Sequence, residues 1–105
     1  MNLLAAMRYL AALNAHGHFA RAAEACHITQ PALSNALRAL EQEFGVAIVR
    51  RGRVFAGLTP EGEQVLQTGL EMLQKEELLR QSLSAQVGQL QGNLRMAAVP
   101  TAMPM

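Results

Sequence analysis

The sequence predicts a mostly α-helical fold in which a helix-turn-helix is followed by a short hairpin and one long helix. Three observations lead to this expectation. Two amphipathic segments, Phe19–Cys26 and Gln30–Phe44, are separated by a turn too short to hold another element. Two β-prone runs then flank Arg51-Gly52-Arg53. No strong break is expected between Thr59 and Gly88, which allows a helix of about 28 residues, roughly 40 Å long.

The first helix is expected to begin at Asn2, whose side chain can cap it, and to stop near His16-Gly17. Glycine favours such an ending because it takes the left-handed conformation without strain. The core-facing stripe of this helix would be Leu3, Met7, Leu10 and Asn14, with Leu13 on one side. The second helix is expected from about Phe19 to Cys26.

The third helix carries the clearest helical signal. Thr29 is a good N-cap, and Pro31 lies in the first turn, where a missing N–H has no cost. Gly45 is expected to end the helix. Its apolar stripe recurs at helical spacing and consists of Leu33, Leu37, Leu40 and Phe44.

The face opposite this stripe is small, polar and basic, and it has no carboxylate before Glu41. It holds Pro31, Asn35 and Arg38, with Ser34 on its flank, and Gln30 is a further outward residue of the helix. An ordinary solvated face usually mixes lysine and glutamate, whereas Asn, Gln, Arg and Ser can all bond base edges or phosphate. The pattern therefore favours a helix that enters the major groove of DNA.

The segment from Val46 to Leu58 predicts a hairpin with a basic tip, which turns the helix-turn-helix into a winged helix. Arg50, Arg51 and Arg53 could merely keep the hairpin soluble. Three arginines on a projecting element beside a recognition helix instead favour contact with phosphate or the minor groove. The fold class predicted is thus mostly α, a winged helix-turn-helix followed by a long linker helix.

The long helix begins at Thr59-Pro60, with glutamates in its first turn facing the helix dipole. One apolar face holds Val65, Met72, Leu79, Leu83, Val87 and Leu90, and a second face in the first half holds Leu66, Leu70 and Leu73. One face would pack on the winged helix and the other would need a partner. We expect a homodimer, and the candidate contacts are Leu66, Leu70, Leu73, Leu79 and Leu83.

Charge is distributed unevenly, although the net formal charge is only +1. Residues 1–58 hold six arginines and three glutamates, and residues 59–105 hold three cationic residues and five glutamates. A basic first half fits a module that faces nucleic acid. No apolar run approaches the ~20 residues of a membrane span, and the start lacks the cationic region of a signal peptide.

Catalytic and metal-binding chemistry has little support in the sequence. Cys26 lies in an alanine-rich helix and is interpreted as a small buried hydrophobe. His16 and His18 form a pair, but no cysteine or acidic cluster converges on them. Glu41 and Glu43 are interpreted as surface charge at a helix end. No metal, no cofactor and no enzymatic activity are expected.

The chain resembles the LysR-type transcriptional regulators of bacteria over nearly its whole length. The matching residues are Ala22-Ala23-Glu24, Gln30-Pro-Ala-Leu-Ser34, Leu40-Glu41, Gly45, Arg51, Leu58-Thr59 and Gly62. The resemblance implies an N-terminal domain of a cytoplasmic, nucleoid-bound regulator. Such a regulator binds double-stranded DNA at an interrupted palindromic operator, as a dimer or, in the full-length protein, as a tetramer.

The resemblance also assigns regions and residues. It implies a DNA-binding domain at 1–58, a linker and dimerisation helix at 59–91, and at 92–105 the start of a truncated effector-binding domain. The chain departs from many members at Asn35, where they have a basic residue, and at His18, where they have Ser or Thr. The alternative function is a winged helix used only for protein–protein association. The expected DNA-binding residues are Arg21, Thr29, Gln30, Pro31, Ser34, Asn35, Arg38, Arg50, Arg51 and Arg53.

Overall fold

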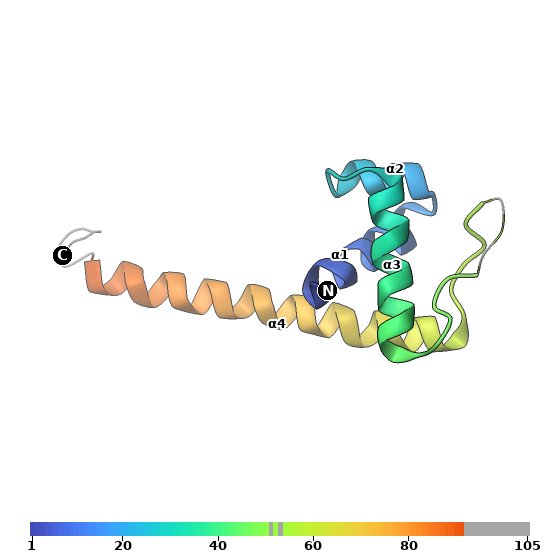
Figure 1. Ribbon diagram of the computed structural model, residues 1–105. Coiled ribbons are helices and arrows are strands. Elements are labelled where there is room, and N and C mark those ends of the chain that lie inside the picture. The colour runs from blue at the N-terminus through green and yellow to red at the C-terminus, as the bar shows by residue number, and fades with distance from the viewer. Residues whose placement is uncertain (51, 53, 92–105) are drawn as a thin grey trace. The chain divides into compact units, whose positions relative to one another are not determined.

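The structure is a computed structural model that describes residues 1–50, 52 and 54–91, with side chains described as far as residue 87. The described residues form four helices (Figure 1), which are α1 (Leu3–His16), α2 (Phe19–Ala25), α3 (Gln30–Phe44) and α4 (Pro60–Gln91). Residues 46–58, which we call the wing, connect α3 to α4. The chain divides into two compact units, and the boundary follows Leu73 inside α4.

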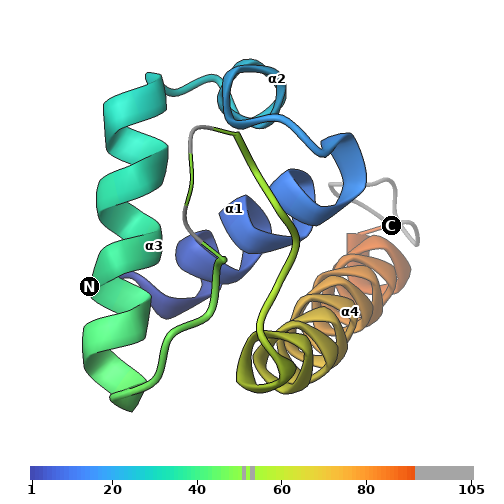
Figure 2. The same cartoon turned by 90° about the vertical axis from the view of Figure 1, so that its right-hand side faces the viewer.

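The three N-terminal helices each pack against the other two (Figure 2). Helix α1 has the expected caps, since the Asn2 side chain accepts a hydrogen bond from the Ala5 amide at 3.1 Å and Gly17 has a φ of 73°. Asn14 is exposed, so the expected stripe is wrong at that position, because Leu13 takes the core-facing place. The buried hydrophobic residues of the described chain are Ala6, Met7, Leu10, Leu13, Ala22, Ala23, Leu33, Leu37, Leu40, Ile48, Val49, Leu58 and Leu66.

Helix α3 has the predicted bounds and the predicted caps. The Thr29 hydroxyl accepts a hydrogen bond from the Ala32 amide at 3.2 Å, and Gly45 ends the helix in the left-handed conformation. Its three leucines are fully buried, but Phe44 is 48% exposed, so the expected core stripe is one residue too long. Phe44 instead lines an apolar groove of about 320 Å³ together with Met7, Val46, Val65 and Met72.

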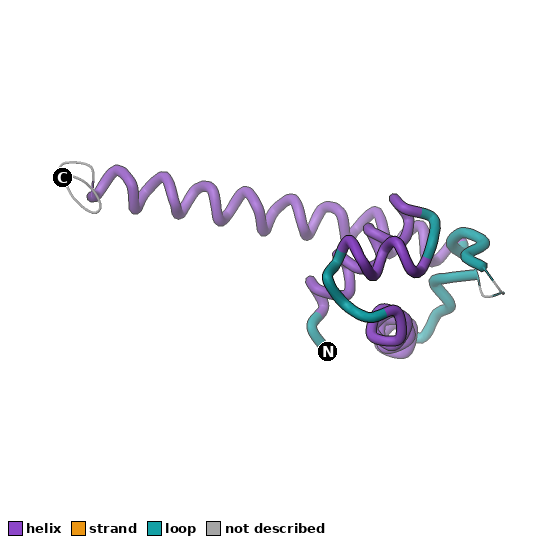
Figure 3. The backbone as a smooth tube through the Cα atoms, turned by 90° about the horizontal axis from the view of Figure 1, so that it is seen from above, coloured by secondary structure: helices purple, strands orange, loops and turns teal. Residues whose placement is uncertain are grey.

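The wing runs out from the end of α3 and returns to the start of α4 (Figure 3). Its two arms are antiparallel, but in the described part of the chain they pair only through an isolated bridge between Val49 and Leu58. The Arg50 amide also donates to the Gly57 carbonyl at 2.9 Å. The expected β-prone runs therefore do not form a regular ladder there. Burial of Ile48, Val49 and Leu58 anchors the arms instead.

Helix α4 begins at Pro60, as predicted, and Thr59 caps it. The Thr59 hydroxyl accepts a hydrogen bond from the Gly62 amide at 2.9 Å and donates one to the Ala47 carbonyl. The Thr59 amide donates to the Ile48 carbonyl at 2.9 Å. One residue thus starts the helix and fastens its first turn to the first arm of the wing.

Two glycines let the first half of α4 approach the core closely. A Cβ atom on Gly62 would collide with the Ile48 carbonyl oxygen, and one on Gly69 would lie 2.5 Å from the Met7 sulfur. Leu66, between them, is only 4% exposed. The prediction that Leu66 contacts a partner chain is therefore wrong, because its side chain is already covered by its own domain. Val65, Met72 and Leu73 pack partly against the same core.

The second unit begins at Gln74, and its described side chains, residues 74–87, belong to α4. All of these side chains except that of Glu76 are exposed. Glu76 pairs with Arg80 at 3.2 Å, one helical turn further on. Large apolar side chains at Leu78, Leu79, Leu83 and Val87 are half or more exposed. Within the described residues, no helix is both long and apolar enough to cross a membrane.

The N-terminus of α2 offers a test of helix capping. His18 has the extended backbone of an N-cap, but its side chain makes no capping hydrogen bond. We expect His18→Ser to raise the free energy of unfolding by about 1 kcal/mol, because serine can accept a bond from an unpaired amide of the first turn. Urea unfolding measures the change. His16→Ser, in the last turn of α1, is the matched control and should give no gain. An equal gain in both variants would contradict the capping explanation.

Gly62 offers a test of close packing. We expect Gly62→Ala to lower the free energy of unfolding by about 1–3 kcal/mol, because the new methyl group meets a backbone carbonyl that cannot turn away. Gly69→Ala is the control, since there the methyl group meets the end of a flexible methionine side chain. Its loss of stability should be smaller. If Gly62→Ala were as stable as the wild type, the close approach of α4 to the wing would be wrong.

Candidate nucleic-acid interface

The exposed face of α3 gathers most of the predicted DNA-binding residues. Gln30, Pro31, Asn35 and Arg38 are exposed and Ser34 is partly buried. Pro31, Asn35 and Arg38 are spaced to lie on consecutive turns opposite Leu33 and Leu37, which are fully buried, and Ser34 lies on their flank. Gln30 is exposed because it is the first residue of the helix. Thr29 lies at the N-terminal edge of this face and its hydroxyl caps the helix.

The composition of this face determines what it can contact. It carries amide, hydroxyl and guanidinium groups, and within its span, Gln30–Arg38, there is no carboxylate. It carries none of the large exposed hydrophobic side chains of the described chain. Such a surface has hydrogen-bond donors for phosphate and base edges and no group that repels an anion.

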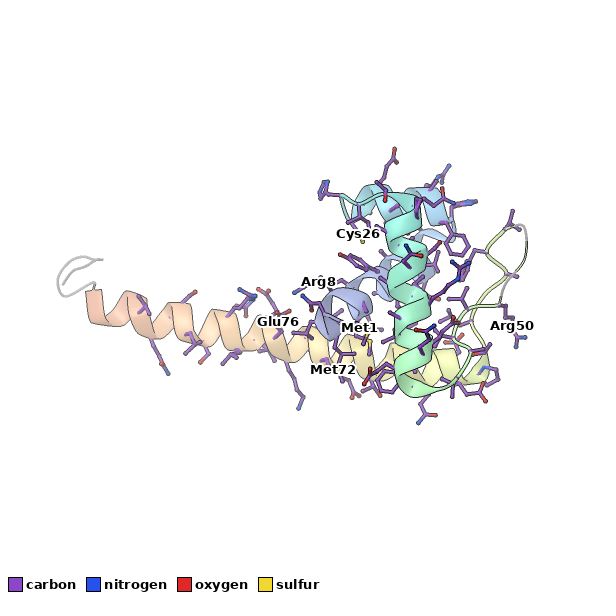
Figure 4. The ribbon with its side chains drawn as sticks, viewed as in Figure 1. Met1, Arg8, Cys26, Arg50, Met72 and Glu76 are labelled. Carbon is purple, nitrogen blue, oxygen red and sulfur yellow. The ribbon has the colours of Figure 1, made fainter. Side chains whose placement is uncertain are left out.

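Arg21 and Arg50 lie on the elements beside α3. Arg21 is exposed on α2, which packs against α3. Arg50 is exposed on the first arm of the wing (Figure 4), and its Nε donates to the Leu58 carbonyl at 3.1 Å. Part of the Arg50 guanidinium therefore helps to close the wing. The predicted residues Arg51 and Arg53 lie outside the described residues.

Glu41 has a different role from the one predicted. Its Oε2 accepts hydrogen bonds from the Ile48 amide at 2.7 Å and from the Val49 amide at 3.1 Å. The interpretation of Glu41 as surface charge is wrong, because the chain turns back after Gly45 and brings the wing over this carboxylate. Hydrogen bonds to a charged group are worth about 1.5–3 kcal/mol each. No local spacing in the sequence points to this role, because the bonded amides lie seven and eight residues further along the chain.

The second arm of the wing is held by an aromatic contact that the sequence analysis missed. The rings of Phe55 and of Phe19, the first residue of α2, meet edge to face with centroids 6.0 Å apart. Such a pair contributes about 0.5–1.5 kcal/mol beyond the area that it buries. The wing is thus fastened to α2, α3 and the start of α4.

Groups with reactive or metal-binding potential do not gather at this surface. Cys26 follows α2 and is partly buried, and this burial raises the pKa of its thiol above the usual value. A raised pKa lowers the thiolate fraction at neutral pH, which makes the sulfur a poor nucleophile. Among the residues that the structure describes, no three histidine, cysteine or acidic side chains are placed to hold a metal ion.

Solved structures resemble this chain closely. Full-length OxyR C199D from Pseudomonas aeruginosa aligns with a TM-score of 0.73 and 38% identity, over 76% of this chain and 27% of that one. The DNA-binding domain of BenM, solved as a complex with benA site 1 DNA, aligns with a TM-score of 0.72 and 30% identity, over 78% of this chain and 92% of that one.

Sequence comparisons lead to the same group of proteins. The SDS degradation transcriptional activation protein of Pseudomonas sp. (strain ATCC 19151) is 41% identical over 95% of this chain and 33% of its own length. The chain spans about a third of the length of the curated relatives it matches. The family model described as bacterial regulatory helix-turn-helix protein, lysR family, matches residues 4–63. The chain therefore belongs to the lysR family of bacterial regulatory helix-turn-helix proteins.

Proposed function

We propose that this chain binds double-stranded DNA in a sequence-specific manner, as the DNA-binding part of a LysR-type transcriptional regulator. The observation that carries the proposal is the exposed face of α3, Gln30–Arg38, which has base-reading side chains and no carboxylate. Membership of the lysR family supports it. So does the likeness to a BenM domain that was solved with DNA.

The mode of binding follows from the shape of α3. The helix presents its N-terminal turns free of bulky apolar side chains, so they can enter a major groove about 12 Å wide. Gln30 and Asn35 can each pair with an adenine edge, and Arg38 can pair with guanine or reach a phosphate. Thr29, Pro31 and Ser34 are small enough to let the helix backbone approach, and Arg21 would meet the DNA backbone from α2.

The wing would add contacts that carry little sequence information. Arg50, Arg51 and Arg53 are the proposed contacts, to phosphate or within the minor groove. Arginine suits both because its planar guanidinium can bond phosphate through two nitrogens.

Two other functions have less support. A winged helix used only for protein association would need an apolar or acidic patch on the exposed face of α3, and in the described chain this face has neither. An enzyme is disfavoured because the relatives are named as transcriptional regulators. A regulator of this kind works in the bacterial cytoplasm, at the nucleoid.

We also propose that two copies associate through α4. Leu79 and Leu83 are 58% and 51% exposed, and Leu70 is 44% exposed. Leu73 is partly buried, and the exposed part of its side chain would lie at the edge of the contact between the two copies. Two copies would place two α3 helices on half-sites about one helical turn of DNA apart, or a multiple of it, which gives an interrupted palindrome.

The regions of the chain would then divide the work. Residues 1–58 would bind DNA, residues 59–91 would link and dimerise, and residues 92–105 would lead into an effector-binding domain.

Selection of bound sequences from a random DNA pool tests the function. We expect enrichment of a pseudo-palindromic motif. If no sequence were enriched over the input pool, sequence-specific binding would be wrong.

Asn35 tests base reading. We expect Asn35→Ala to leave the fold and the salt dependence nearly unchanged but to relax the preference at one base pair per half-site, by about 1–3 kcal/mol. Asn35→Arg should move that preference toward guanine. Relative affinities for the four base pairs at each half-site position measure both effects. Gln42→Ala, an exposed amide on the last turns of the same helix, is the control. Identical profiles for all these proteins would mean that Asn35 does not read a base.

Arg53 tests the wing. We expect Arg53→Ala to weaken binding to all sequences by a similar factor and to reduce the slope of log K against log salt by about 0.9 for each phosphate that is no longer bound. Arg80→Ala removes the same charge outside the proposed site and should leave the slope unchanged. Titrations at several salt concentrations provide the slopes. An unchanged slope in Arg53→Ala, in Arg51→Ala and in the double variant would place the wing away from DNA.

Leu79 and Leu83 test dimerisation. We expect their joint replacement by glutamate to give monomers that still fold, because both side chains are exposed and neither belongs to the core. Sedimentation equilibrium measures the mass, and circular dichroism the fold. Gln81→Glu with Ala85→Glu adds the same charge to the opposite side of α4 and should preserve the dimer. A monomeric wild type at high micromolar concentration would contradict the proposal.

A further inference from the structure

The wing has few bonds of its own, so its position is set by neighbouring helices. Among the described residues its arms share only the Val49–Leu58 bridge and the two bonds that Arg50 makes to the opposite arm. An isolated pair of short arms is not stable by itself in water. The orientation of the wing must therefore come from the groups that hold its base and its second arm.

One of these groups belongs to the helix that carries the proposed DNA-reading face. Glu41 stands one turn beyond Arg38 on α3, and its carboxylate accepts the Ile48 and Val49 amides at 2.7 and 3.1 Å. These two amides stand at the base of the first arm, directly before Arg50. The recognition helix and the first arm are thus joined by one side chain through two charge-assisted hydrogen bonds.

The other fastenings of the wing reach different elements. Thr59 bonds the Ala47 and Ile48 carbonyls from the start of α4, and Phe19 meets Phe55 from α2. Of these described side-chain fastenings, only that of Glu41 comes from α3, and the Val46 amide adds a backbone bond to the Glu41 carbonyl at 3.2 Å. Removal of its carboxylate would leave the wing anchored by these contacts and by the burial of Ile48, Val49 and Leu58, but without the side-chain bonds that fix its first arm to the recognition helix.

We propose that Glu41 is a positioning residue for DNA binding, which sets where the wing meets the DNA backbone while α3 lies in the major groove. This inference rests on the proposed function. Glu41 touches no DNA in this role, since its Oε2 faces the amides of the wing. Its removal weakens the hold of the wing on DNA and leaves the base preference of α3 unchanged.

The test compares Glu41→Gln with Glu43→Gln in the full 105-residue chain. Both variants remove one negative charge from the same helix end, but Glu43 is exposed and Glu41 is partly buried. Glutamine at position 41 is a neutral and therefore weaker acceptor. DNA carrying the sequence selected by the wild type is the probe. Binding is measured at several salt concentrations, with the active fraction of each protein determined by stoichiometric titration.

For Glu41→Gln we expect the slope of log K against log salt to fall by about 0.9 for each phosphate that the wing no longer binds. We also expect weaker hydroxyl-radical protection of the DNA outside the major-groove contacts, with base preferences unchanged. Glu43→Gln should keep the wild-type slope and protection. A purely structural role would reduce the active fraction and leave the slope of the remaining active protein unaltered.

Amide hydrogen exchange keeps the test decisive if Glu41→Gln folds poorly. We expect the Ile48 and Val49 amides to exchange at least tenfold faster while the amides of α1 and α3 stay protected. Glu41→Asp, which keeps the charge but is shorter, is the second variant and should show the same pattern. The proposal is overturned if Glu41→Gln keeps the wild-type salt slope and the wild-type hydroxyl-radical protection of the DNA. It is also overturned if the α3 amides lose their protection from exchange in both Glu41→Gln and Glu41→Asp. A wild type that selects no DNA sequence would overturn the proposed function instead.

Discussion

The carboxylate of Glu41 accepts hydrogen bonds from the two amides at the base of the wing. We infer that the position of the wing relative to α3 depends on this interaction. A short pair of arms cannot hold itself in place, because it forms too few backbone bonds. The charged acceptor compensates, and Thr59 adds a second anchor at the same base. The proposed DNA contacts on α3 and on the wing are thereby carried by one connected unit.

At the base of the wing, the backbone of α4 also lies close to the backbone of the first arm. Gly62 lets the first turn of α4 lie directly against the Ile48 carbonyl, where any side chain would collide. Gly69 permits a similar approach to Met7 two turns later. Helix propensity disfavours both glycines, so tertiary packing must compensate for their cost. The result is a helix whose first half serves the core, while its second half exposes leucines.

The two faces of α3 divide stability from recognition. Leu33, Leu37 and Leu40 are fully buried and hold the helix on the domain. The opposite face contributes nothing to the core, so its residues are free to be selected for contact with a ligand. No polar or charged side chain of the described chain is buried. The polar groups on the face of α3 therefore stay accessible.

The sequence by itself determined the four helices, the caps at Asn2, Thr29 and Thr59, and the polar face of α3, because periodicity and capping act over a few neighbouring residues. Only the tertiary structure decided the role of Glu41, the burial of Leu66 and the exposure of Phe44. Each of these depends on which segment returns to cover a side chain. The segment that covers the side chain is distant in sequence, and its position is set by the turn after Gly45 and the close approach at Gly62. Local residue spacing therefore cannot predict these contacts.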